Sequence, residues 1–250
     1  MSTSTELELS VAHTAGILYP GYSAEDDYPA LERLFGAQVR LPLVHTEMRE
    51  DAHRVDALLD IGGHEVLAEG VARLPRVDAV IWACTSGSFV FGYDGAREQV
   101  DKLQAVAGVP ASSTSFAFLR AAGRLGLARV AVAATYPADV AGRFVEFLGA
   151  GGLEVLRCAS RGIVTAAEVG TLTREQVCEF AAANDHPEAQ AVLLPDTALH
   201  SVGVLDELED RLGKPVLTAN QVTAWEALRL AGYDRHCDGL GTLFRASTGG

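Results

Sequence analysis

Short apolar runs alternate with longer amphipathic segments along almost the whole chain of 250 residues. The apolar runs have the length of buried strands and cover residues 14–18, 38–44, 78–83, 109–112, 129–133, 153–158, 189–194 and 215–217. The amphipathic segments have helical spacing and cover residues 24–35, 55–73, 96–107, 115–125, 137–150, 174–183, 204–212 and 222–231. Strict alternation of strand and helix is typical of βαβ units, so the sequence predicts an α/β fold with parallel sheets.

The motifs of the first half recur in the same order in the second half. Tyr19-Pro20, which follows the first predicted strand, is matched by Tyr136-Pro137, and AVIWACT at 79–85 is matched by AVLLPDT at 191–197. Two further pairs follow in order, 108–110 with 213–215 and 119–123 with 228–232. This order predicts two homologous lobes, and lobes that face each other would bring the matched strand ends to opposite sides of one cleft.

We place the first lobe at residues 12–126, the second at 127–232 and a tail at 233–250, with the C-terminal helix free to cross between lobes. A chain of this size buries a sizeable core without disulfides. Its content of 48% hydrophobic and 21% charged residues excludes a disordered or collagen-like protein.

The charge balance limits the partners of the chain. Its 33 Asp and Glu against 20 Lys and Arg give a net charge of −13, which repels phosphate backbones and anionic membranes, so we expect neither nucleic acid nor membrane as a partner. Four cysteines without a CxxC pair suggest neither a zinc site nor a disulfide framework and favour a reducing compartment. Residues 1–10 do not resemble a secretion signal, and no apolar stretch approaches membrane-span length. We therefore expect a cytoplasmic protein that binds a small molecule, with a homo-oligomer compatible with the sequence.

Cys84 is the strongest candidate for a catalytic side chain. Ligands of parallel sheets bind beyond the carboxyl ends of the strands, and Cys84 follows such a strand in the polar sequence CTSGS. Backbone N–H groups and hydroxyls there can stabilise a thiolate, a carboxylate or an enediolate. The alternative is a small buried hydrophobic residue, which we expect for the other three cysteines.

Asp196 occupies the corresponding strand end in the second lobe. It is either a general acid or base or a helix N-cap before Thr197. Tyr136 and its counterpart Tyr19 either donate a hydrogen bond to an anionic ligand or are half-buried loop aromatics. The hydroxyls of 112–115 are expected to cap the following helix, and the seven histidines are expected in surface or cap roles. The absence of a GxGxxG or GxxxxGK[ST] motif argues against a nucleotide.

Together, these motifs resemble the maleate cis-trans isomerase and arylmalonate decarboxylase family, within the aspartate/glutamate racemase superfamily. The similarity covers about residues 12–232 and rests on GILYP, CTSGS, STSFAFLRAAGRLG, VAVAATYPADV and AVLLPDTAL. It implies two pseudo-symmetric Rossmann-like lobes with parallel sheets and the active site in the cleft between them, and catalysis on small carboxylates without a metal or an organic cofactor.

The resemblance also implies roles for individual residues. Cys84 matches the first catalytic cysteine, a nucleophile or acid/base in the isomerases and a glycine in the decarboxylase. Thr85, Ser86 and Tyr136 match residues that hold a substrate carboxylate or enediolate. The sequence departs from the family at three places: Asp196 stands where the second cysteine is expected, and Ser23 and Thr165 stand near the positions of two asparagines.

Three functions follow from this set of residues. The first is a cofactor-independent isomerase or racemase in which Cys84 opposes Asp196 as nucleophile, acid or base. The second is a decarboxylase whose enediolate is protonated by Cys84. The third is a non-catalytic paralogue that binds a carboxylate. In each, we expect Thr85, Ser86, Tyr136, Thr197, Ser23 and Tyr19 to bind the ligand.

Overall fold

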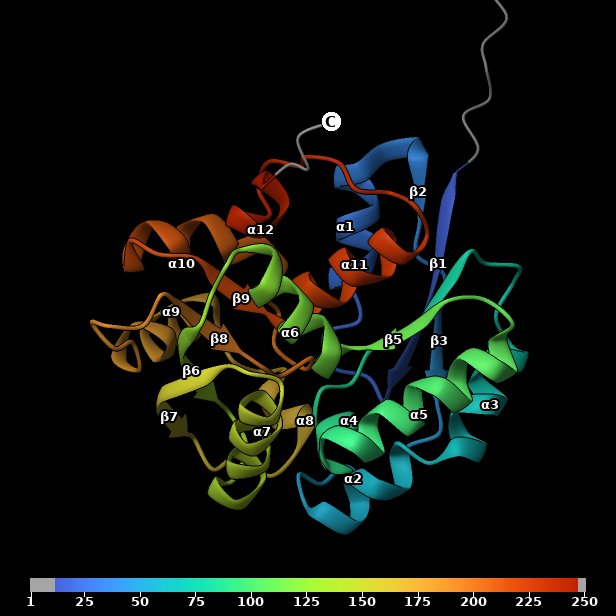
Figure 1. The fold of residues 1–250 in the computed structure, drawn as a ribbon, viewed down its shortest axis with the longest axis horizontal. Coiled ribbons are helices and arrows are strands. Elements are labelled where there is room, and N and C mark those ends of the chain that lie inside the picture. The colour runs from blue at the N-terminus through green and yellow to red at the C-terminus, as the bar shows by residue number, and fades with distance from the viewer. Residues whose placement is uncertain (1–11, 247–250) are drawn as a thin grey trace, which may run out of the picture.

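The computed structural model describes residues 12–246 and has two parallel sheets, which confirms the predicted α/β class (Figure 1). The first sheet has the strand order β2-β1-β4-β5, with β3 also paired to β1, and the second has the order β7-β6-β8-β9. Every strand pair is parallel. The strands of the first sheet precede those of the second in the chain, as the repeated motifs predict.

The first sheet and its surroundings come from the N-terminal half of the chain. Its strands are β1 (His13–Pro20), β2 (Val39–Arg40), β3 (Leu43–Thr46), β4 (Ala79–Trp82) and β5 (Ala111–Ser113). Its helices are α1 (Asp27–Phe35), α2 (Val55–Ile61), α3 (His64–Ala72), α4 (Ser86–Phe89), α5 (Gly92–Ala107) and α6 (Thr114–Arg124), with the 3₁₀ helix η1 (Gly36–Gln38). Helices α3 and α5 pack against each other, and α5 also contacts β5.

The second sheet follows the same plan. Its strands are β6 (Arg129–Ala134), β7 (Glu154–Ser160), β8 (Ala191–Leu194) and β9 (Val216–Thr218). Its helices are α7 (Ala138–Ala150), α8 (Ala166–Val169), α9 (Arg174–Ala183), α10 (Leu205–Leu212), α11 (Ala219–Leu230) and α12 (Gly241–Arg245), with the 3₁₀ helix η2 (Val202–Val204). Strands β6 and β8 are thus the counterparts of β1 and β4 at the middle of each sheet.

The structure differs from the sequence-based elements where a local residue interrupts a regular pattern. The strand expected at 38–44 is divided into β2 and β3 around Pro42, which has no N–H for a strand ladder. The helix expected at 55–73 is divided at Gly62-Gly63 into α2 and α3. Helices α4, α8 and α12 were not predicted, because each has only four or five residues.

Helix α11 crosses from the second half of the chain to the first sheet. It packs against β1, β4 and β5 and against α6, and is buried on most sides. The segment expected as a tail contributes α12, whose Leu243 and Phe244 are buried. The boundaries of the two predicted lobes stay a prediction. Within residues 12–246, no helix combines the length and apolar character needed to cross a bilayer.

Candidate active site

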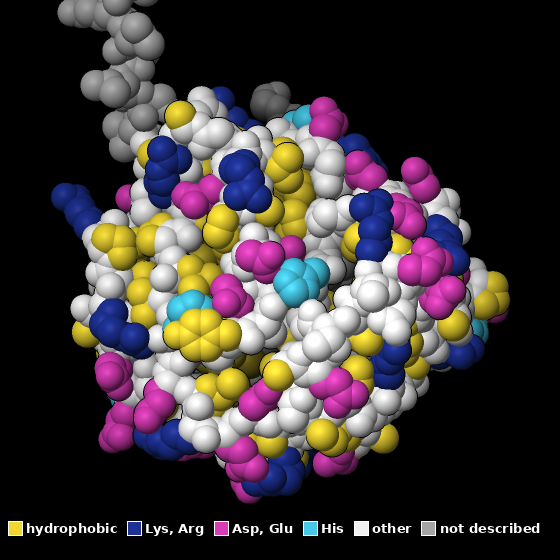
Figure 2. Space-filling model, turned by 180° about the vertical axis from the view of Figure 1, so that it is seen from behind, with side chains coloured by type: hydrophobic (Ala, Val, Ile, Leu, Met, Phe, Trp, Pro, Cys, Tyr) yellow, Lys and Arg dark blue, Asp and Glu magenta, His cyan; other side chains and the backbone are white. Residues whose placement is uncertain are grey.

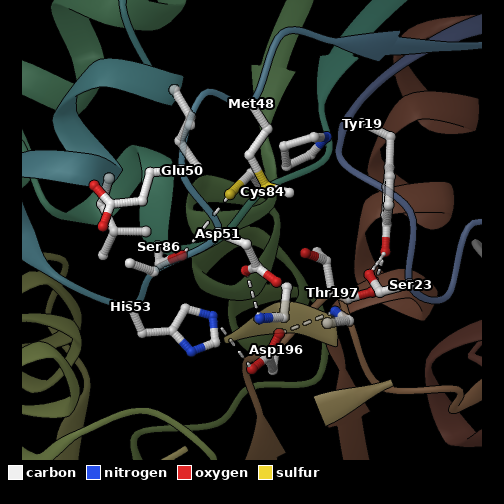
Figure 3. A pocket seen from close by; sticks show the side chains of 16 residues that line it. Tyr19, Ser23, Met48, Glu50, Asp51, His53, Cys84, Ser86, Asp196 and Thr197 are labelled. Atoms are coloured by element: carbon white, nitrogen blue, oxygen red, sulfur yellow. Dashed lines mark hydrogen bonds and ion pairs between the residues drawn. The ribbon is translucent and has the colours of Figure 1, made fainter. Parts of the chain in front are cut away.

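Cys84 and Asp196 lie at equivalent positions of the two sheets. Each is the second residue beyond its strand, Cys84 after β4 and Asp196 after β8. Both strands are fully buried apolar runs that deliver a polar side chain where the chain leaves the sheet. The two side chains approach one cavity from different sheets (Figure 3).

The cavity has a volume of about 30 Å³, enough for about two water molecules. Sixteen residues line it: Tyr19, Pro20, Ser23, Met48, Glu50, Asp51, Ala52, His53, Leu58, Ile61, Cys84, Ser86, Ala166, Asp196, Thr197 and Ala198. Six of the eight predicted site residues are among them; Thr85 and Tyr136 are not. The lining contains no Lys or Arg, so any anion must be held by hydroxyls, backbone N–H groups or histidine.

The Cys84 thiol lies in a buried but polar environment. The N–H of Gly87 donates to Sγ at 3.3 Å, and the hydroxyl of Ser86 lies 3.8 Å from it. Burial raises the pKa of Cys84 to about 11, and the charge of Asp196 acts in the same direction, against the Gly87 and Ser86 bonds. Cys84 is therefore held as a thiol at pH 7, where about one side chain in ten thousand is ionised.

The two oxygens of the Asp196 carboxylate have different partners. Oδ1 accepts the N–H of Ala198 at 2.9 Å, as a cap of the turn does. Oδ2 accepts a very short hydrogen bond from the hydroxyl of Thr135 and faces Nε2 of His53 at 4.0 Å. The N-cap and acid/base alternatives are therefore compatible in one residue.

Tyr19 joins the two strand ends. Its hydroxyl donates to the carbonyl of Thr197 at 2.9 Å, accepts the N–H of Ala24 at 3.1 Å and bonds the hydroxyl of Ser23 at 2.8 Å. Burial raises its pKa above the ordinary range. Tyr19 is only 1% exposed, so it is a buried bridge and not the half-buried loop aromatic of the alternative prediction.

Tyr136 and Thr85 lie behind the cavity wall. The Tyr136 hydroxyl donates to the carbonyl of Pro195 at 2.7 Å, so its proton is not free for a ligand in this conformation. Burial raises the pKa of Tyr136 well above its usual value; the charges of Asp196 and Cys84 add to this, and the hydroxyls of Thr85 and Ser86 oppose it. The buried hydroxyl of Thr85 has no hydrogen-bond partner among the described residues.

A strap of residues 47–54 closes the cavity and was missed by the sequence analysis. It follows β3 and is bonded to the second half of the chain: the Asp51 carboxylate accepts the N–H groups of Ala166 and Ala167 at 2.7 and 3.0 Å. The N–H of His53 donates to the carbonyl of Val164 at 2.7 Å. Applying the strand-end rule to β3 would have identified this segment.

The histidine prediction is wrong for His53 and holds for His200. His53 is 8% exposed and lines the cavity, although we expected a surface or cap role. His200 is half-exposed and bonds Asp26 at 2.9 Å outside the cavity. The predicted cap is present: Ser113 accepts the N–H of Phe116 at the start of α6. Thr165 similarly caps α8 through the N–H of Glu168. Among residues 12–246, no group of three or more His, Cys, Asp and Glu is arranged to hold a metal ion.

The turn that carries Cys84 is supported from behind by close backbone packing. The Gln99 amide donates to the carbonyls of both Gly62 and Gly87 at 2.8 Å. A Cβ atom at Gly62 would overlap the Gly87 carbonyl, and one at Gly87 would lie 3.1 Å from the Cys84 Sγ. Glycine is thus required at both positions by close approach and not by backbone angle.

Charges on the surface do not gather by sign on the face seen in Figure 2. Basic side chains are interspersed with acidic ones there, and apolar side chains occupy a hollow between them. The excess of negative charge is therefore distributed over this face, and the polarity of the cavity is set by the few groups that line it.

Three comparisons place this chain among known proteins. The arylmalonate decarboxylase family model matches residues 56–244. The chain is 32% identical to arylmalonate decarboxylase of Bordetella bronchiseptica, over 74% of this chain and 81% of that protein. It is 25% identical to maleate isomerase of Geobacillus stearothermophilus, over 67% and 69%. The crystal structure of a maleate isomerase variant of Pseudomonas putida S16 with maleate has a TM-score of 0.85 at 21% identity, over 94% and 98%.

Proposed function

The chain is an enzyme of the arylmalonate decarboxylase family, and from this we propose that it is a cofactor-independent isomerase or racemase of a small carboxylate. Cys84 and Asp196 are the proposed catalytic residues. The single observation that carries the proposal is that these two proton-transferring side chains line one cavity from the ends of equivalent strands. A substrate between them meets a proton-transferring group on each face.

The protonation of Cys84 favours one order of steps. Because burial keeps the thiol protonated, Cys84 begins the cycle as an acid. Asp196 takes the α-proton from one face of the substrate, and the electron pair of the broken C–H bond moves into the carboxylate to give an enediolate. Cys84 then donates its S–H proton to the other face. The reverse direction begins with the thiolate and a protonated Asp196, so proton exchange must reset the enzyme.

We propose that hydroxyls hold the substrate carboxylate. Ser86, Ser23 and Thr197 line the cavity, and the buried hydroxyl of Thr85, between the lining residues Cys84 and Ser86 in the chain, has no hydrogen-bond partner among residues 12–246. Tyr19 and Tyr136 are proposed to bind the ligand as well, which requires their hydroxyls to turn away from the carbonyls of Thr197 and Pro195 to which they now donate. An unpartnered buried hydroxyl favours a ligand that accepts a hydrogen bond, since leaving it unpaired costs about 1–3 kcal/mol.

Electrostatics favours a substrate that does not bring a second carboxylate beside an ionised Asp196. Two like charges 4 Å apart repel by about 4 kcal/mol at an effective dielectric constant of 20. The cavity lining offers no Lys or Arg to offset this repulsion. We therefore propose a monocarboxylate, or a dicarboxylate that binds when Asp196 carries a proton.

Decarboxylation of a malonate-type substrate is the second candidate. It is supported by the family match and by a relative at 32% identity that is an arylmalonate decarboxylase. The apolar side chains Met48, Leu58 and Ile61 line part of the cavity and would pack against an uncharged substituent. After loss of CO₂, one protonated thiol suffices to deliver a proton to the enediolate, and Cys84 is such a thiol.

The functions are separated by product analysis in deuterated water. The protein is incubated with maleate, with each enantiomer of aspartate, glutamate and 2-phenylpropionate, and with phenylmalonate. Racemised or isomerised product, with deuterium at the α-carbon of racemised substrate, supports the first proposal. CO₂ release with deuterium at the α-carbon of a monocarboxylate supports the second. No conversion of any substrate on this panel contradicts both.

The cellular setting is proposed on the same basis. All four cysteines are free, two of them buried, and free thiols favour the reducing cytoplasm. The proposed partner is a small carboxylate, because the relatives are named for their action on such molecules, arylmalonate and maleate.

A further inference from the structure

His53 reaches the cavity from the strap and is fixed there by the other half of the chain. Its side chain is 6% exposed. Nδ1 lies 3.0 Å from the carbonyl oxygen of Ile163, and its backbone N–H bonds the next carbonyl, that of Val164. The edge of the Tyr136 ring meets the imidazole with centroids 4.9 Å apart. A buried ring held on three sides has a defined orientation.

That orientation identifies the nitrogen of His53 that exchanges protons. A carbonyl oxygen only accepts hydrogen bonds, so Nδ1 must carry the hydrogen that it donates to Ile163. Nε2 is therefore the nitrogen that gains or loses a proton. It faces Oδ2 of Asp196 at 4.0 Å, and both groups line the same cavity as Cys84 (Figure 3).

Asp196 is the carboxylate that faces His53; its oxygens accept the N–H of Ala198 and the hydroxyl of Thr135, and neither group is charged. The other two carboxylates of the lining bond elsewhere: Glu50 pairs with Arg54 at 2.9 Å, and Asp51 accepts two backbone N–H groups of α8. The remaining titratable groups around the ring are the buried hydroxyls of Tyr136 and Tyr19 and the thiol of Cys84. A bare Nε2 and an ionised Asp196 would leave two electron-rich groups facing each other.

We propose that His53 and Asp196, coupled by charge across the 4.0 Å between Nε2 and Oδ2, together carry one exchangeable proton and act as a single acid–base unit opposite Cys84. The inference rests on the proposed function, because the unit takes the place assigned there to Asp196 alone. His53 is a positioning residue in this unit: it sets the charge of Asp196, which meets the substrate.

The proton balance of the unit follows from its two forms. With one proton on the pair, the groups are either an imidazolium beside a carboxylate or an imidazole beside a carboxylic acid, and the pair is neutral in both. An anionic substrate can therefore enter. When the ionised Asp196 takes the α-proton, the unit holds two protons and one positive charge, which offsets the one negative charge that the substrate carboxylate gains as it becomes an enediolate. Delivery from Cys84 and return of a proton from the unit to the thiolate restore the starting state.

The first test measures the pair without any substrate. The imidazole of His53 is titrated by NMR in the full-length protein and in Asp196→Asn, which keeps an acceptor for the N–H of Ala198. Loss of a carboxylate that faces the ring should change the titration of His53 in the direction of easier proton loss. The exposed His64 on α3 is the matched control and should not change. An unchanged midpoint of His53 overturns the inference, whatever the activity of the protein.

The second test asks whether turnover uses the pair. In His53→Asn, the side-chain N–H can still donate to the carbonyl of Ile163, but the titrating nitrogen is gone. In His53→Gln, the longer side chain places an amide nearer to Asp196. We expect an unchanged melting temperature for His53→Asn, with kcat reduced at least 100-fold and a pH limb lost from the rate profile. A wild-type pH profile in a folded His53→Asn protein overturns the inference. If the wild-type enzyme converts no carboxylate, the proposed function fails, and the titration alone decides on the pair.

Discussion

The hydroxyl of Tyr19, at the end of β1, donates to the carbonyl of Thr197, beyond the end of β8, at 2.9 Å. This buried bond links the loops that carry the two halves of the candidate site. Asn220 of α11 donates to the same carbonyl at 3.1 Å and to Asp27 at 2.9 Å. The loop at Thr197 is thus held by β1, α1 and α11, all of which belong to or pack on the first sheet.

Removal of the Tyr19 hydroxyl should therefore loosen one half of the site against the other. In Tyr19→Phe, Ser23 and the N–H of Ala24 lose their partner, and we expect the free energy of unfolding to fall by about 1–3 kcal/mol. Urea denaturation measures this loss. Tyr22→Phe is the matched control, since Tyr22 is 73% exposed and its ring stacking on His45 is kept. Equal stability of both variants would contradict the bridging role.

The sequence was sufficient to predict the positions that β4 and β8 bring together. Cys84 and Asp196 follow fully apolar strands, and the alternation of strands with helices implies that the carboxyl ends of parallel strands share an edge. The bond from Tyr19 to Thr197 was not predictable, because it depends on how two separate sheets are oriented. No local pattern encodes that orientation.

Alkaline pH should destabilise the protein through Cys84. The folded protein holds the thiol proton more tightly than the unfolded chain, whose thiol titrates near 9.0, against about 11 when buried. Stability from this group is complete below pH 9 and is lost as the pH rises toward 11. A shift of this size corresponds to about 2–3 kcal/mol at most. The stability difference between wild type and Cys84→Ala should narrow by that amount between pH 8 and 11 in urea titrations. A difference that does not depend on pH would argue that the thiol is not buried as described.

Gly62 should be essential for catalysis although it lies outside the cavity. A methyl group there overlaps the carbonyl of Gly87 and contacts the Gln99 amide, so the turn must shift and carry the Gly87 N–H away from Cys84. We expect Gly62→Ala to lose about 1–3 kcal/mol of stability and most of the activity. Gly142→Ala, on the exposed face of α7 with open space around it, should instead gain about 0.5–1 kcal/mol. Thermal unfolding and initial rates test both variants.

His53 illustrates what a sequence cannot supply. It stands in a loop without a helical or strand pattern, and isolated histidines are common on surfaces. The role proposed for it depends on Ile163, 110 residues away, which fixes the ring, and on Asp196, which faces it. The order of strands could have directed attention to residues after β3, but only the packing of the strap against α8 brings His53 to Asp196.

We expect the strap to move when substrate enters, because it lines a cavity with room for only about two water molecules. Asp51 holds it closed by accepting two N–H groups at the start of α8. Asp51→Ala removes this contact, and we expect a loss of about 0.5–2 kcal/mol, as for other helix caps. Amide exchange at Ala166 and Ala167 should accelerate. KM should rise by a larger factor than kcat falls, because part of the free energy of substrate binding is then needed to order the strap.

Glu50→Ala is the control for that variant. Glu50 is the preceding residue of the strap and is exposed, and its partner Arg54 belongs to the same segment, so its loss leaves the contact with α8 intact. In the Glu50→Ala variant, amide exchange at Ala166 and Ala167 should match that of the wild type. If the amides of Ala166 and Ala167 exchange at the wild-type rate in Asp51→Ala as well, Asp51 does not hold the strap in place. The backbone hydrogen bond from His53 to Val164 then holds it.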